Sequence, residues 1–501
     1  MNAPAMPARP LRLSWPIPLA AVLAVLAVML PLVCWCGVAN PRIIPGLFSL
    51  PWTNAGGTLS AAGTVFVLLA VPLAWMLAAG RGDLVAIWLM QNAMLAGGYF
   101  LLPETAGELN LPKLTTSIVN TGGLVAMINA LGFSILLVTL GLTYLFARLS
   151  GARLEPLRAA PQILDRRLSG LLRVAAVCCV GAIVLSMAVT HTIPMLAPDP
   201  ETARYVFDEN AVTRALFNAN MAILPFVCAG LVVLFFRDPF RHLGLDGWLV
   251  GGLLAAEMLA GNRFPLAIAA MATLSLLSME KRWPRWMLLA AIVGYCVLFI
   301  SLSGFTSIWR QDREALNSNE GIVETSFRQA YLGNNLIDYR DAAWVFSRWD
   351  RQPLMGRSYL GGMAEMLPSG IFPLKKQWHL GQIALRMVGW GGYKHFGLRL
   401  SCFGESFLNF GYAGVAGLAV ILGIGLGALS RCLHLLSRPG QPVCLARNLG
   451  IVMLVQMLLI WTNSADAYGF WALLVFYAII RTVVIHGGNL RTGAIPKPAA
   501  T

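Results

Sequence analysis

The chain has 501 residues, of which 57% are hydrophobic and 12% are charged, and its formal net charge is +14. Soluble domains carry about 25% charged residues, so the composition excludes a cytosolic enzyme and predicts a polytopic membrane protein. The basic residues lie in short segments between apolar runs rather than in one soluble patch, which argues against a nucleic-acid partner.

Apolar runs divide the chain into twelve predicted membrane-spanning helices. A membrane-spanning helix needs about 20 mainly apolar residues. The runs lie at 17–37, 59–79, 84–102, 124–147, 170–190, 216–236, 247–260, 264–279, 286–303, 407–429, 447–463 and 467–485. The first run exceeds the apolar core of a signal peptide and others follow it, so we expect an uncleaved signal anchor.

The distribution of lysine and arginine predicts that both termini lie on the cytoplasmic side. With the N-terminus inside, the cytoplasmic segments hold 20 of the 37 basic residues and the short outer segments hold 5. This bias follows the positive-inside rule. It predicts helices over 1–303, one large outer segment over 304–403, and the last three helices with a cytoplasmic tail over 404–501.

The segment 304–403 is far longer than an ordinary connection between helices. It is rich in Trp, Tyr, Phe, Leu and Met, which argues against disorder. The stretches 341–349 and 358–367 have the pattern of short amphipathic helices. The predicted fold is therefore all-α, with about twelve membrane helices and one large, partly helical outer loop between the ninth and the tenth.

A candidate anion site lies between the predicted helices 247–260 and 264–279. These helices of 14 and 16 residues rise roughly 21 and 24 Å, less than the hydrocarbon core of about 30 Å. Their connection is therefore expected below the outer membrane surface, with Asn262 as helix cap and Arg263 beside a helix N-terminus. Glu257 is an intramembrane carboxylate, which makes it a functional candidate, and a structural Glu257–Arg263 pair is the alternative.

The composition of the large loop suits the binding of a phosphorylated glycan. It holds twelve basic and eight acidic residues, interspersed with tryptophan and tyrosine. Arginine binds phosphate oxygens through two hydrogen bonds at once, and aromatic faces suit sugar rings. No Asp-x-Asp motif occurs in the outer segments and no Gly-x-Ser-x-Gly motif in the chain, and the nine cysteines lack metal-ligand spacing. The sequence therefore predicts no metal site and no cofactor, with arginine charge stabilising a diphosphate leaving group.

Several motifs follow one another in an order that resembles a known family. They are 353–359 (PLMGRSY), Leu367 with Pro368, 373–376 (PLKK) and 404–414 (GESFLNFGYAG). Together with the turn at Arg263, this order resembles the oligosaccharide repeat-unit polymerases, the O-antigen polymerase (Wzy) family. The resemblance covers roughly 260–425, and the Gly-Glu-(x)3-Asn-Phe-Gly segment is its most specific part.

The resemblance implies an inverting, metal-independent glycosyltransferase with a GT-C-like helical fold in the bacterial inner membrane. Such an enzyme works on the periplasmic side. It moves a growing glycan from one polyprenyl diphosphate, such as undecaprenyl diphosphate, to the next lipid-linked repeat unit. The implied partners are the lipid-linked oligosaccharide, membrane lipid and, as a further candidate, a chain-length regulator.

The residues that match or flank these motifs receive candidate roles. Arg263, with Arg386 or Arg328, is expected to bind the departing diphosphate, and Glu405 to act as a base or to orient the acceptor. An acid in the first turn of a helix is, however, favoured by the helix dipole alone. His379 is a further catalytic candidate. The remaining candidates are expected to bind substrate: Arg357, Tyr359, Lys375, Lys376, His395 and Asn409.

Two other classes stay open. O-antigen ligases share the general layout, but their motif has a histidine followed by a small polar residue, whereas Leu380 follows His379 and Phe396 follows His395. A transporter of lipid-linked glycans would also have twelve helices, but charged residues are scarce within the predicted spans. We therefore expect a polymerase first, a ligase-type transferase second and a transporter third.

Overall fold

The computed structural model describes residues 116–301 and 339–486, apart from short gaps that include 150–159, 262–263, 365–369, 391–397, 439–442 and 464–467. The predicted spans at 17–37, 59–79 and 84–102 lie outside the described residues, and the span at 286–303 is described only in part. Arg263, Arg328 and His395 also lie outside them.

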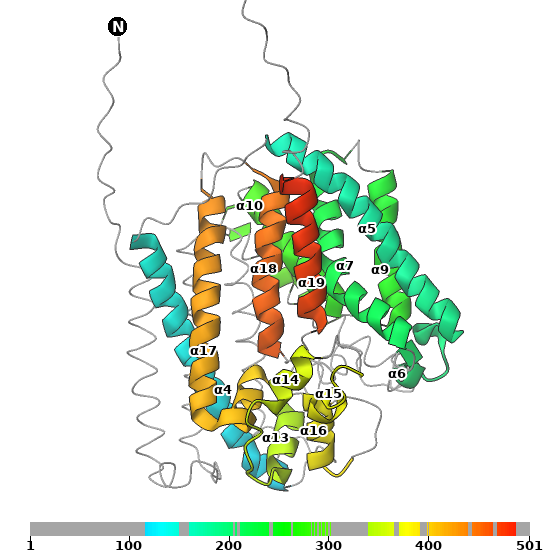
Figure 1. Cartoon of the computed structure of the whole chain (residues 1–501). Coiled ribbons are helices and arrows are strands. Elements are labelled where there is room, and N and C mark those ends of the chain that lie inside the picture. The colour runs from blue at the N-terminus through cyan, green and yellow to red at the C-terminus, as the bar shows by residue number, and fades with distance from the viewer. Residues whose placement is uncertain are drawn as a thin grey trace, which may run out of the picture.

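All elements of the described part are helices (Figure 1). They are α4 (Thr116–Leu149), α5 (Pro161–Thr190), η1 (Pro194–Leu196), α6 (Pro200–Ala203), α7 (Ala211–Arg237), α9 (Leu245–Ala260), α10 (Phe264–Lys281), α13 (Tyr339–Arg348), α14 (Arg357–Met363), α15 (Lys375–Trp378), α16 (Leu380–Met387), α17 (Cys402–Leu436), α18 (Leu445–Asn463), α19 (Tyr468–Ile479) and η4 (Ile480–His486). Among the described helices, α4, α5, α7 and α17 contain segments long and apolar enough to cross a membrane. The predicted all-α fold is confirmed for this part, while twelve spans and a GT-C-like arrangement stay predictions.

The outer helix α5 shows why the bundle suits a lipid environment. Leu168 and Leu172 on its inner face are buried, whereas Val174 and Val177 are more than half exposed. Figure 1 shows α5 along one edge of the bundle. Soluble monomers rarely expose apolar surface of this extent, whereas a helix satisfies its own backbone hydrogen bonds in lipid. These features are those of an α-helical membrane protein.

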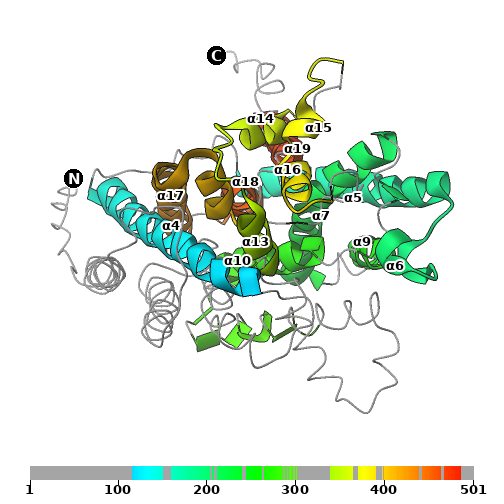
Figure 2. The ribbon, with the colours of Figure 1, turned by 90° about the horizontal axis from the view of Figure 1, so that it is seen from below.

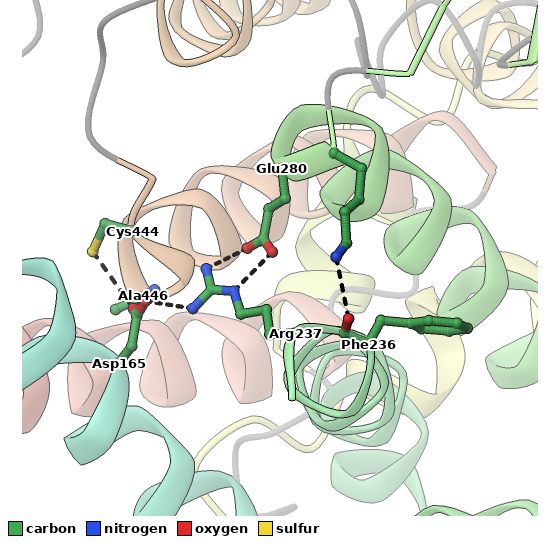
Figure 3. A network of polar contacts seen from close by, with 7 residues as sticks. Asp165, Phe236, Arg237, Glu280, Cys444 and Ala446 are labelled. Atoms are coloured by element: carbon green, nitrogen blue, oxygen red, sulfur yellow. Dashed lines mark hydrogen bonds and ion pairs between the residues drawn. The ribbon is translucent and has the colours of Figure 1, made fainter. Parts of the chain in front are cut away.

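The long helices have their charged ends at one end of the bundle. Arg237 at the end of α7 contacts Glu280 at the end of α10 and Asp165 near the start of α5 (Figure 3). Asp165 also accepts a hydrogen bond from the backbone N–H of Ala446 at the start of α18. The short helices α13 to α16 lie at the opposite end, as the view from that end shows (Figure 2).

Two glycines bring α17 against α4. Gly423 and Gly427 are four positions apart and therefore share a helix face. A Cβ atom at Gly423 would lie 2.9 Å from the carbonyl oxygen of Leu136, and one at Gly427 would lie 2.6 Å from that of Leu140. This is the close backbone approach that small residues permit between membrane helices.

Replacing Gly427 with alanine is expected to reduce the stability of the bundle by about 1–3 kcal/mol, because the added methyl group meets backbone of α4. Gly417→Ala is the matched control, since a Cβ at Gly417 has open space in the same helix. The control is expected to be neutral or to stabilise by up to about 1 kcal/mol. Thermal unfolding of the purified protein in detergent measures both, and equal effects would contradict the packing argument.

Candidate functional site

The candidate site begins with a break in α17. Gly411 has φ 62° and ψ −151°, a conformation that is accessible almost only to glycine. The break separates a short N-terminal part of α17, residues 402–410, from the long helix that follows. The carbonyl oxygens of Leu408 and Asn409, just before the break, accept hydrogen bonds from the backbone N–H groups of Leu354 (2.9 Å) and Met355 (3.1 Å). The loop before α14 is thereby fixed along the end of the short helix.

A buried polar lock, formed by Ser358, Glu405 and Asn409, joins α14 to α17. Ser358 Oγ donates to Glu405 Oε1 at 2.5 Å and accepts from Asn409 Nδ2 at 2.7 Å. Asn409 Nδ2 also donates to the carbonyl oxygen of Glu405, and its Oδ1 accepts from the backbone N–H of Gly356 at 2.8 Å. Ser358 and Asn409 are 0% exposed and Glu405 is 1% exposed, so these bonds are shielded from water.

A second contact beside the lock fixes the next residue of α14. The Tyr359 hydroxyl and Ser406 Oγ lie 2.6 Å apart, and the Tyr359 ring stacks on Phe410. Burial raises the pKa of the Tyr359 phenol, and the nearby Glu405 carboxylate raises it further. Tyr359 therefore stays neutral at physiological pH and acts as a hydrogen-bonding group rather than as a phenolate.

Backbone strain accompanies the lock. Arg351 has φ 66° and Met355 has φ 51°, values that residues other than glycine adopt rarely. Each such backbone conformation costs about 1–3 kcal/mol of folding free energy and persists only where the surrounding structure imposes it. Such strain is most common at functional sites. At Met355, its own backbone hydrogen bond to α17 and that of Leu354 hold the strained conformation in place. The strained turn leads directly into Arg357, whose side chain is exposed.

Two further candidates, His379 and Arg386, lie outside the lock, at the start and near the end of the loop helix α16. His379 is the N-cap of α16, where its Nδ1 accepts a hydrogen bond from the backbone N–H of Gly381 at 3.2 Å. Arg386 is exposed, and its guanidinium donates to the backbone carbonyls of Gln377 and Gln382. Neither carbonyl carries a charge, so these contacts orient the cation without neutralising it.

The structure thus brings together some of the residues that the sequence predicted. Tyr359, Glu405 and Asn409 belong to one cluster, and exposed Arg357 lies next to it. Lys375 and Lys376 begin α15, but their side chains lie outside the described atoms. His379 and Arg386 belong to the separate α16.

Near the turn predicted at Arg263, the structure describes only the flanking residues. Helix α9 ends at Ala260 with Gly261 in the left-handed conformation, and α10 begins at Phe264. Glu257 is fully buried and accepts a hydrogen bond from Asn220 Nδ2 at 3.3 Å. Its pairing with Arg263 stays a prediction.

Sequence reasoning missed Ser358 and Ser406, the two hydroxyl groups that complete these contacts. Ser358 stands 47 residues before Glu405, and no spacing rule connects positions so far apart in a loop. Its position inside the motif 353–359 was the available signal.

Comparisons with family models, with curated proteins and with solved structures found no match for this chain. The buried groups of the site can position α14, and its exposed arginine can bind an anion.

Proposed function

We propose that this protein polymerises lipid-linked oligosaccharide repeat units in the bacterial inner membrane. It acts as an inverting, metal-independent glycosyltransferase with its active site facing the periplasm. The bond between the anomeric carbon of the growing glycan and its polyprenyl diphosphate breaks. A new bond forms to a hydroxyl oxygen of the next lipid-linked unit, the hydroxyl proton passes to the departing diphosphate, and polyprenyl diphosphate is released.

One observation carries this proposal. The motif segments 353–359 and 404–414, on which the resemblance to the polymerases rests, are in direct contact through the buried lock. The motif residues share one site although the sequence separates them by about 50 positions. A strained loop held by buried hydrogen bonds is the kind of local structure that occurs at functional sites.

The geometry favours a positioning role for Glu405. Glu405 is 1% exposed and its carboxylate already accepts a hydrogen bond from the Ser358 hydroxyl, so it is poorly placed to take a proton from a sugar. Phosphate binding is assigned to the arginines Arg357, Arg386, Arg263 and Arg328, which can stabilise the charge that develops on the departing diphosphate. Lys375, Lys376, His379 and His395 are proposed to complete the substrate site.

The proposed topology has twelve spans, a GT-C-like arrangement and both termini in the cytoplasm. Helices α7 and α10 end in Arg237 and Lys281 at one end of the described bundle, and helices α13 to α16 of the predicted outer loop lie at the other. The positive-inside rule assigns the basic end to the cytoplasm. The lock and Arg357 then belong to the periplasmic side.

A strain that lacks the gene provides the test, with its surface glycan and lipid-linked intermediates as the readout. The proposal predicts single repeat units on the lipid carrier at the outer face of the membrane and no long chains. Long chains that stay on the lipid carrier would instead indicate a ligase. Intermediates that accumulate facing the cytoplasm would indicate a transporter, and the site assignments would then be wrong.

Arg263→Ala is expected to abolish long chains in the complemented strain while the protein accumulates normally, because the diphosphate loses its cation. Arg263→Lys should restore little activity if the contact needs two parallel hydrogen bonds. Arg348→Gln is the control, since Arg348 is an exposed arginine of α13 at the same end of the bundle. Wild-type chain lengths from Arg263→Ala would refute this role.

A further inference from the structure

A second charged cluster lies at the end of the bundle opposite the candidate site, where α4 and α17 end. Arg431 is 5% exposed, and its Nε and Nη1 atoms are buried without a hydrogen-bond partner. Its guanidinium carbon lies 5.8 Å from the centre of the Tyr144 ring, so α4 covers one side of the cation. A buried charge with incomplete hydrogen bonding is costly, and such groups normally have a partner.

Further basic residues occupy the same two helix ends. Arg148 lies in the last turn of α4, and Arg438 directly follows Ser437, the C-cap residue of α17. His434 is held in place by the Tyr144 hydroxyl, which lies 2.6 Å from its Nδ1. Arg148 is half-buried and Arg438 is exposed, so the cluster extends from the buried guanidinium to the surface.

Among the described residues, the ion pairs with a carboxylate are made by Arg173 and Arg237 and not by Arg431, and the two adjoining segments carry no net negative charge. The C-terminal ends of α4 and α17 attract cations, but they leave Nε and Nη1 of Arg431 without an acceptor. The segment 150–159, which follows α4, contains Arg153 and Arg158 against Glu155, so its formal charge is also positive. The segment 439–442, which follows α17, contains no charged residue.

We propose that Arg431, together with Arg148, His434 and Arg438, binds the phosphate group of an anionic phospholipid. Arginine donors bind phosphate oxygens through directed hydrogen bonds. Basic pockets between membrane helices are sites where such headgroups bind. The site is separate from the lock at the other end of α17 and does not depend on the reaction that the protein catalyses.

The test uses the purified full-length protein in detergent, titrated with phosphatidylglycerol or with zwitterionic phosphatidylcholine and followed by native mass spectrometry. Wild-type protein is expected to bind phosphatidylglycerol preferentially. Arg431→Gln should weaken that binding by at least about tenfold, the factor that one charge-assisted hydrogen bond represents. Arg438→Gln should weaken it less, and because Arg438 is exposed, this variant tests the site without endangering the fold.

Arg166→Gln is the matched control, because Arg166 is an exposed arginine near the start of α5 at the same end of the bundle. It removes the same charge and should leave lipid binding unchanged. Equal losses in Arg166→Gln and Arg431→Gln, or unchanged binding in Arg431→Gln, would overturn the proposal. A parallel titration with inorganic phosphate distinguishes the source of the ligand. If phosphate alone binds as tightly as the lipid and requires Arg431, the lipid assignment is wrong and the site binds the free anion.

Discussion

Replacing Arg237 with methionine is expected to destabilise the protein by about 3–5 kcal/mol, the cost of removing one partner from a buried ion pair. Arg237 binds both carboxylate oxygens of Glu280 through Nε and Nη2, and its Nη1 lies 2.6 Å from Asp165 (Figure 3). The side chains of Glu280 and Asp165 are only 4% and 12% exposed. The substitution therefore leaves two carboxylates close together with little water to screen their repulsion.

Thermal unfolding in detergent measures this loss, and two further variants identify its cause. Combining Arg237→Met with Glu280→Gln and Asp165→Asn removes the unpaired charges, so the triple variant should recover part of the stability that Arg237→Met loses. Arg166→Met, at an exposed position of α5, should change stability by no more than about 0.5 kcal/mol. A triple variant less stable than Arg237→Met would show that the lost charge network is not the cause.

Replacing Asn409 with leucine is expected to release α14 from α17 and to abolish polymer formation. The substitution removes the side-chain partner of Gly356 N–H and one partner of Ser358 Oγ. Each buried polar group left unsatisfied costs about 1–3 kcal/mol. The strained conformations of Arg351 and Met355 add to the tendency to open. Because the lost hydrogen bonds all lie at the junction of α14 with α17, local opening is expected rather than global unfolding.

Hydrogen exchange of the backbone amides of Leu354, Met355 and Gly356 measures this opening. Their protection should fall strongly in Asn409→Leu, while protection in the core of α7 stays unchanged. Asn129→Leu is the matched control, because the Asn129 side chain is equally buried but donates to Val125 of its own helix. Normal exchange of the loop in Asn409→Leu would mean that the backbone bonds to Leu408 and Asn409 hold α14 without the side-chain lock.

Hydropathy predicted the helices well where apolar residues define both ends. The run 264–279 became α10, Phe264–Lys281, because lipid-compatible residues fill it from end to end. The prediction began α5 at 170, whereas the helix begins at Pro161. Asp165 and the neighbouring arginines lower the mean hydropathy, so the first turns of α5 resemble a loop in the sequence. In the folded helix, the ion pair with Arg237 compensates the charge of Asp165.

Arg431 shows the same limitation at the other end of a helix. The predicted span ended at 429, which placed this arginine in a cytoplasmic segment as a solvated charge. Helix α17 continues to Leu436 and buries it. At the candidate site, the motif resemblance predicted Tyr359, Glu405 and Asn409 one by one. Their connection through Ser358 depends on the docking of α14, which only the folded chain brings about.

The buried lock separates the residues of α14 that can be substituted without loss of structure from those that cannot. Ser358 of α14 and Asn409 of α17, which hold α14 in place, are completely buried. The side chains of Arg357 and Leu360, also in α14, are exposed. The residues that fix the position of α14 are therefore different from the residues that can contact a ligand. Selection can exchange the outward-facing side chains, and with them the ligand that the surface prefers, without disturbing the attachment of α14 to the membrane helix.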